Sequence, residues 1–109
     1  MADKTMEFIN ICGIPFKVKE VDVIDEDMGG IVLGKICHSQ ATILIKKDTP
    51  KELKKSVIFH EVLHGILVQL GYDEISSDET FVQSLSNAMY NMFEFKDEDE
   101  RWHFSMVER

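Results

Sequence analysis

Cysteine is scarce in this chain of 109 residues: the sequence holds two, Cys12 and Cys37, and they lie far apart. Two distant cysteines do not make a disulfide framework. Without a Cys-x-x-Cys pair they do not indicate a cysteine-ligated zinc site either. We therefore expect two free thiols in a reducing cytoplasm.

Long apolar runs are also missing. The longest, residues 62–70, is interrupted by His64 and Gln69, and it is much shorter than the roughly 20 residues that span a bilayer. Residues 1–5 lack the apolar stretch of a secretory signal. We expect a cytoplasmic protein with no membrane segment.

Basic residues are outnumbered, with 12 Lys and Arg against 20 Asp and Glu, and the net charge is −8. A surface of this sign repels phosphate backbones, which argues against direct nucleic-acid binding. The acidic clusters at residues 22–27 and 97–100 are typical of solvated loops or helix ends. Length and a hydrophobic fraction of 44% predict one globular domain over residues 1–109, with an acidic and aromatic C-terminal tail from about residue 96.

Alternation of apolar and polar residues predicts the strands. Residues 7–11 and 15–21 are expected to form a hairpin, and residues 31–36 and 41–46 a second one. The sheet is therefore expected to be small and mostly antiparallel, with about three to four strands. Whether strand 41–46 lies at an edge, where it could pair with an extended substrate, or inside the sheet stays open.

A long helix is predicted from about residue 50 to residue 70. Asp48 or Thr49 can cap its first N–H groups, and Pro50 suits its first position. Gly71 then ends the helix. Together with the strands, this pattern predicts the α+β class.

A second helix is expected after a loop at residues 72–76, with Ser76 or Ser77 as its cap. Its apolar residues recur with helical spacing and are expected to form a stripe that faces the core. These residues are Phe81, Leu85, Met89 and Met92.

The first helix carries the sequence His60-Glu61-Val62-Leu63-His64, an H-E-x-x-H pattern. Residues four apart lie on one helix face, so His60 and His64 can reach one metal ion, with Glu61 beside it as a general base. The flanks are apolar nearly all round, which predicts a buried helix whose polar groups need partners. The alternative is a helix with one hydrogen-bonded core histidine and one solvated glutamate.

A catalytic zinc needs a third protein ligand besides two histidines. Asp78 and Glu79 are the leading candidates, since the first turn of a following helix holds a carboxylate more rigidly than a loop does. Either could instead simply favour the helix N-terminus. The other candidates are His38, Asp73, Glu74 and His103.

The H-E-x-x-H motif and the downstream segment that begins at Glu79 resemble the ImmA/IrrE-like metallopeptidases, many of them phage or mobile-element proteins. The resemblance extends from about residue 6 to residue 95. In that family the second helix has a glutamate ligand, a small apolar residue three positions on, and then Asn. Here Glu79, Val82 and Gln83 occupy these positions.

The resemblance implies a minimal zincin-like fold with one Zn²⁺ per chain, bound by His60, His64 and Glu79 rather than Asp78. It implies Glu61 as the catalytic base and a protein substrate, often a transcriptional repressor. Gln83, in place of Asn, would hydrogen-bond a ligand histidine.

Two further functions remain open beside the zinc endopeptidase: a catalytically inactive metal-binding or protein-interaction module, and a metal-dependent hydrolase of a non-peptide substrate. For the peptidase, the side chains that could assist at the oxyanion are Tyr72, Tyr90 and His103. The sequence does not indicate an oligomeric state.

Overall fold

The computed structural model describes residues 4–24, 32–98 and 101–106, and the side chains of residues 4–7 and 93–106 are outside the description. The first half of the chain is mainly strands, β1 (Lys4–Ile11), β2 (Ile14–Val21), β3 (Gly34–Cys37) and β4 (Thr42–Lys46), with the short 3-10 helix η1 (His38–Gln40) before β4. The second half contains the helices α1 (Lys51–Gln69), α2 (Asp73–Ser76) and α3 (Glu79–Tyr90), then the strands β5 (Phe93–Glu98) and β6 (Arg101–Met106).

The first four strands form a mixed sheet in the order β1-β2-β4-β3. Both predicted hairpins are confirmed, because β1 pairs antiparallel with β2 and β3 pairs antiparallel with β4. Cys12 and Gly13 turn the first hairpin with φ angles of 51° and 89°, as the tightest hairpin turns require. Strands β2 and β4 are parallel neighbours, which the sequence did not predict.

Strand β4 lies inside the sheet, between β2 and β3. Its Ile43 and Ile45 are fully buried. This answers the question left open for residues 41–46: the edge strand on this side is β3. It begins at Gly34, and the predicted start at Ile31 falls outside the described residues.

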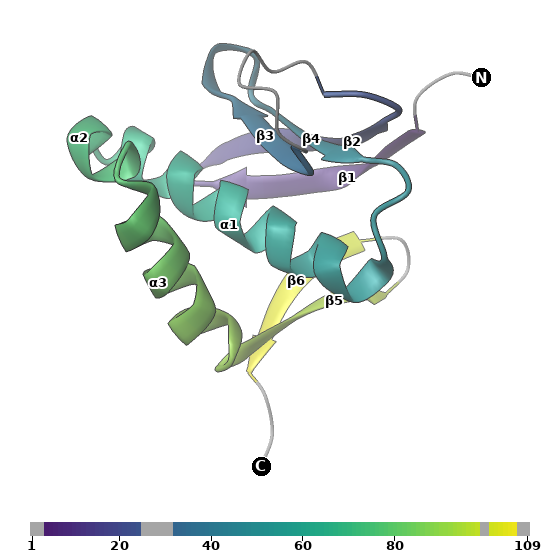
Figure 1. The fold of residues 1–109 in the computed structure, drawn as a ribbon. Helices are drawn as coiled ribbons and strands as arrows, with labels where there is room; N and C mark the ends of the chain where they lie inside the picture. Colours follow the sequence, from purple (N-terminus) through teal and green to yellow (C-terminus); the bar gives the residue numbers. More distant parts are fainter. Residues whose placement is uncertain (1–3, 25–31, 99–100, 107–109) are drawn as a thin grey trace.

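Helix α1 lies across one face of the sheet, and α3 packs against α1 and leads away from the sheet (Figure 1). The core between sheet and helix includes Phe16 and Val18 from β2 and Ile58, Phe59 and Val62 from α1. The α+β class is therefore confirmed. None of the described helices has the length and apolar content needed to cross a membrane.

The end of α1 agrees with the prediction, but its N-terminal cap does not. Gly71, with φ of 89°, ends the helix as expected, since its N–H bonds to Val68 O and that of Tyr72 bonds to Leu67 O. The predicted cap is wrong: Pro50 occupies the N-cap position, with no side-chain cap. Thr49 is buried, and its hydroxyl has no hydrogen-bond partner among the described residues.

The segment between α1 and α3 differs from the predicted loop. Residues Asp73–Ser76 form the single helical turn α2. The cap of α3 is Asp78, whose Oδ1 accepts a hydrogen bond from Phe81 N at 3.1 Å. A serine cap was predicted because Ser, Asp and Asn cap helices about equally well, so sequence alone does not rank them.

The predicted core stripe of α3 is rotated relative to the real one. Leu85 and Met89 pack against the core, partly buried, as predicted, but Phe81 and Met92 are 44% and 53% exposed. Val82 and Ser86 are the buried positions instead. The period was right, but the face that meets α1 is set by packing. After α3 the predicted tail is a hairpin of β5 and β6, and β6 contacts β1, so the C-terminal segment folds back onto the sheet.

Candidate metal centre

His60 and His64 lie on one face of α1, one turn apart, as the motif predicted. Their Nε2 atoms are 3.1 Å from each other. His64 is 8% exposed and His60 is partly buried. The two imidazoles therefore aim the same ring atom at one point.

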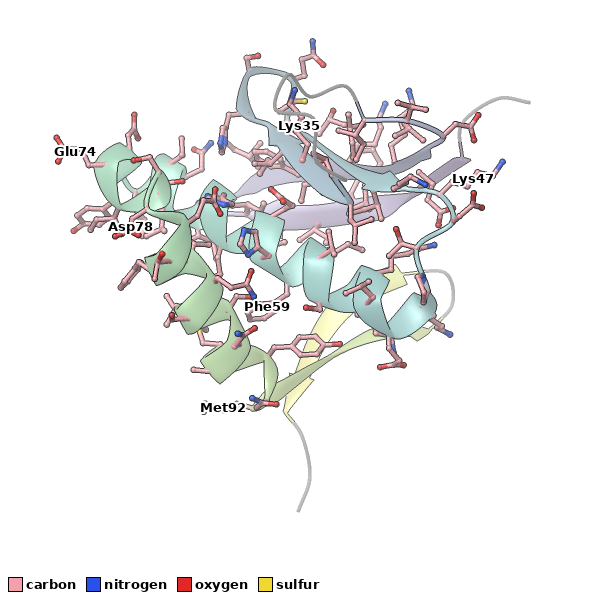
Figure 2. The ribbon with its side chains drawn as sticks, in the orientation of Figure 1. Lys35, Lys47, Phe59, Glu74, Asp78 and Met92 are labelled. Atoms are coloured by element: carbon pink, nitrogen blue, oxygen red, sulfur yellow. The ribbon has the colours of Figure 1, made fainter. Side chains whose placement is uncertain are left out.

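Glu79, the first residue of α3, brings a carboxylate to that point. Its Oε1 is 3.1 Å from His60 Nε2 and 3.3 Å from His64 Nε2. Asp78, the other leading candidate, is the helix cap instead. Figure 2 shows Glu74 on the outer side of α2, directed away from α1. Of the candidate carboxylates, the structure brings Glu79 to the two histidines.

These distances fit a bound cation. Two ligand atoms each about 2.0–2.1 Å from a tetrahedral zinc are roughly 3.3–3.4 Å apart, close to the 3.1–3.3 Å separations of the three side chains. The group His60, His64 and Glu79 could thus hold a metal ion. Two imidazoles and one carboxylate suit zinc, but also other first-row divalent ions.

Ser76 supports His64 from behind. Its Oγ lies 3.0 Å from His64 Nδ1, and both side chains are buried. A proton on Nδ1 donated to Ser76 leaves the Nε2 lone pair of His64 facing Glu79, so both facing atoms are acceptors and a cation between them removes the conflict. The sequence indicated Ser76 only as a helix cap, and its role here depends on the unpredicted turn α2.

The role predicted for Gln83 is wrong. Its amide donates to Asn87 Oδ1 at 2.9 Å along the exposed side of α3, whereas Ser76 contacts His64. Nδ1 of His60 is buried with no hydrogen-bond partner in the part of the chain that the structure describes. The two histidines are therefore held unequally.

The protonation of His64 favours metal binding. Burial lowers the pKa of His64, the nearby His60 adds to this effect, and Glu79 opposes both without reversing the direction. The neutral imidazole, which is the metal-binding form, is therefore favoured at neutral pH.

Replacing Ser76 with alanine is expected to weaken zinc binding by about 10–100-fold, the usual effect of removing a partner of a ligand histidine. The reason is that His64 loses the contact that sets its tautomer and ring orientation. Competition with a fluorescent zinc chelator would measure the affinity. Ser77→Ala is the matched control, since the Ser77 hydroxyl donates to Glu74 O; equal affinities of the two variants would contradict this role of Ser76.

The three converging side chains open into a cavity of about 390 Å³. Helix α1 contributes Glu61 beside the two histidines, β3 and η1 form one wall, and α2 and α3 contribute Ser76 and Glu79. The other residues that line the cavity are Gly34, Lys35, Ile36 and His38.

Gly34 sets the distance between the edge strand and α1. A Cβ at this position would collide with Val57 Cγ1 and would stand 3.5 Å from Glu61 Oε2. A glycine is needed here because β3 passes directly over the helix. The carboxylate of Glu61, which is 9% exposed, consequently lies against the edge strand.

Replacing Gly34 with alanine is expected to destabilise the fold by about 1–3 kcal/mol, the usual cost of overpacking. Val57 is branched at Cβ and cannot simply rotate away. Urea denaturation would measure the change. In a Val57→Ala background the same substitution should cost much less, and an equal cost in both backgrounds would show that the collision with Val57 is not its cause.

Of the three side chains predicted to assist at an oxyanion, the two that the structure describes, Tyr72 and Tyr90, do not line the cavity. Tyr72 is 52% exposed after the end of α1, and the ring of Tyr90 packs edge-on against Phe59 with centroids 5.8 Å apart. The side chain of His103 lies outside the described residues. His38, which the sequence suggested only as a metal ligand, does line the cavity.

Comparison with protein-family models, with curated proteins and with solved structures finds no match. The resemblance to ImmA/IrrE-like metallopeptidases therefore stays an expectation from the motif residues. The structure adds to it a His60, His64 and Glu79 group compatible with a zincin-like H-E-x-x-H site.

Proposed function

We propose that this protein is a zinc-dependent peptidase, with His60, His64 and Glu79 as ligands of one Zn²⁺ and Glu61 as the general base. The observation that carries the proposal is the approach of three ligand atoms at coordination spacing within a cavity that also contains a buried carboxylate. A zinc ion at such a site supplies Lewis-acid polarisation of a carbonyl and acidification of water.

Glu61 has the position that a general base needs. It directly follows His60, lines the cavity and is largely buried. It accepts a proton from the water whose oxygen bonds to the substrate carbonyl carbon. As the C–N bond breaks, Glu61 delivers that proton to the leaving amine nitrogen. Water is thereby divided between the two products, and Glu61 returns to its starting state.

The edge strand supports a peptide as the substrate. Leu33 O accepts a hydrogen bond from Lys46 N, and in an antiparallel ladder residues two apart point their backbone groups to the same side. Leu33 therefore directs its backbone groups toward β4. Gly34 and Ile36 lie an odd number of residues from Leu33, so they direct their N–H and C=O groups away from β4. Both residues line the cavity, so an extended chain could pair with β3 there.

The test is cleavage of quenched fluorescent casein by the zinc-loaded protein. We expect hydrolysis that 1,10-phenanthroline abolishes and added zinc restores. If zinc binds but neither casein nor a mixed peptide library is cleaved, the non-catalytic metal-binding module becomes the better account. A transcriptional repressor, suggested by the family resemblance, is the substrate class to examine next.

A further inference from the structure

We propose that His38 is a second catalytic residue, whose imidazole donates a hydrogen bond to the substrate carbonyl oxygen as that oxygen gains negative charge. This inference deepens the proposed peptidase function and rests on it. It concerns a residue outside the group that could hold the metal, from the opposite wall of the same cavity.

The course of β3 brings His38 to the wall of the cavity. A Cβ on Gly34 would meet Val57 and Glu61, whereas one on Gly65 would meet Ile36. Strand β3 therefore runs along α1 in the same direction, past Glu61 and toward the turn that follows it. His38 comes two residues after Ile36 and lines the cavity with His60, Glu61 and His64.

The backbone at His38 is held by the short helix η1. His38 O accepts a hydrogen bond from Ala41 N at 3.2 Å, and Ala41 takes a left-handed φ of 48°. The hydroxyl of Thr42 donates to Gln40 O at 2.9 Å. A turn held by hydrogen bonds positions a side chain more reproducibly than an open loop does. The His38 side chain itself is exposed to solvent.

The chemistry of the cavity wall assigns the donor role to His38. As the water oxygen bonds to the carbonyl carbon, the carbonyl oxygen becomes an oxyanion and needs a hydrogen-bond donor. Among the lining residues, Glu61 and Glu79 are acceptors, and Ser76 is buried at the Nδ1 side of the His64 ring, away from the Nε2 atoms that converge with Glu79. These groups therefore do not supply the donor.

Two lining side chains, Lys35 and His38, carry N–H groups suited to this task. Gly34 and Ile36 face α1, and successive side chains of a strand point to opposite faces. Lys35 thus starts from the face of β3 that is turned away from α1. His38 donates its N–H without transferring the proton, so the proton balance of Glu61 is unchanged.

The experiment compares wild type, His38→Ala and the neighbouring control Ser39→Ala by isothermal titration calorimetry of the zinc-loaded proteins. Two probes are used. A phosphonamidate tripeptide has tetrahedral oxygens that mimic the oxyanion, whereas acetohydroxamate binds a metal without that geometry. We expect His38→Ala to weaken the phosphonamidate by about 10–100-fold, with zinc content and acetohydroxamate affinity unchanged and Ser39→Ala like wild type.

The same proteins are assayed on quenched casein, where His38→Ala should lower kcat by about 10²-fold with little change in KM. Unchanged phosphonamidate affinity in His38→Ala, or no phosphonamidate binding by the wild type, overturns the inference. Lowered zinc content in His38→Ala also overturns it, because His38 would then be a ligand. A selective loss of phosphonamidate binding without casein cleavage by the wild type supports the oxyanion site and counts against the peptidase.

Discussion

Replacing Glu61 with glutamine is expected to lower kcat for peptide hydrolysis by about 10³-fold while the protein keeps one zinc per chain. Glutamine has nearly the same shape as glutamate but cannot accept the proton of the attacking water, and general bases commonly contribute 10²–10⁴-fold. Glu61 lies beside His60 without belonging to the converging group, so metal binding and proton transfer should separate in this variant.

Initial rates on quenched casein, with zinc content by mass spectrometry on the same samples, would measure both effects. The matched control is Glu52→Gln, on the same helix but at its exposed start, where Glu52 lies 3.6 Å from Lys55. That variant should behave as wild type. Full activity in Glu61→Gln would exclude Glu61 as the base, whereas loss of zinc in this variant would instead make it a ligand.

Replacing Glu79 with glutamine is expected to weaken zinc binding by more than about 10²-fold, above the effect of outer-sphere partners. The neighbouring variant Asp78→Asn should keep its zinc. Glu79 faces His60 and His64 at 3.1–3.3 Å, whereas Asp78 caps α3, a role that asparagine fills equally well. His60→Ala should lose zinc as Glu79→Gln does.

Thermal unfolding gives an independent measurement of the same prediction. Zinc at a thousand times its Kd stabilises a folded protein by about 4 kcal/mol, which raises the Tm of a domain of this size by about 15–30 °C. Wild type and Asp78→Asn should show that rise, and Glu79→Gln should show little of it. A zinc-dependent rise in Glu79→Gln with none in Asp78→Asn would reverse the assignment of the third ligand.

Sequence patterns predicted that α3 is a helix, but not which of its residues are the most buried. The spacing of Phe81, Leu85 and Met89 defines an apolar stripe, but the helix buries Val82 and Ser86 most completely. An apolar period gives the helix and its approximate face. The rotation about its axis depends on which residues of α1 it meets, and these are distant in sequence.

The places of Ser76 and His38 in the cavity were not predicted, for a related reason. Serine before a helix is ordinarily a cap, and a histidine in a turn is ordinarily solvated, so neither residue has a local pattern that indicates a site. Ser76 reaches His64 because α2 makes one helical turn after Gly71. His38 reaches the cavity because β3 is the edge strand beside α1.

The sequence by itself determined the α+β class, the two hairpins and the pairing of His60 with His64, because hairpins and helix faces depend on residues only a few positions apart. It also singled out Glu79 through the family resemblance. Only the tertiary structure brought Glu79 rather than Asp78 to the histidines, set Ser76 behind His64 and made β3 the edge of the cavity. Those arrangements depend on how α1, α3 and the sheet pack, and packing joins residues whose separation along the chain leaves no periodic signal.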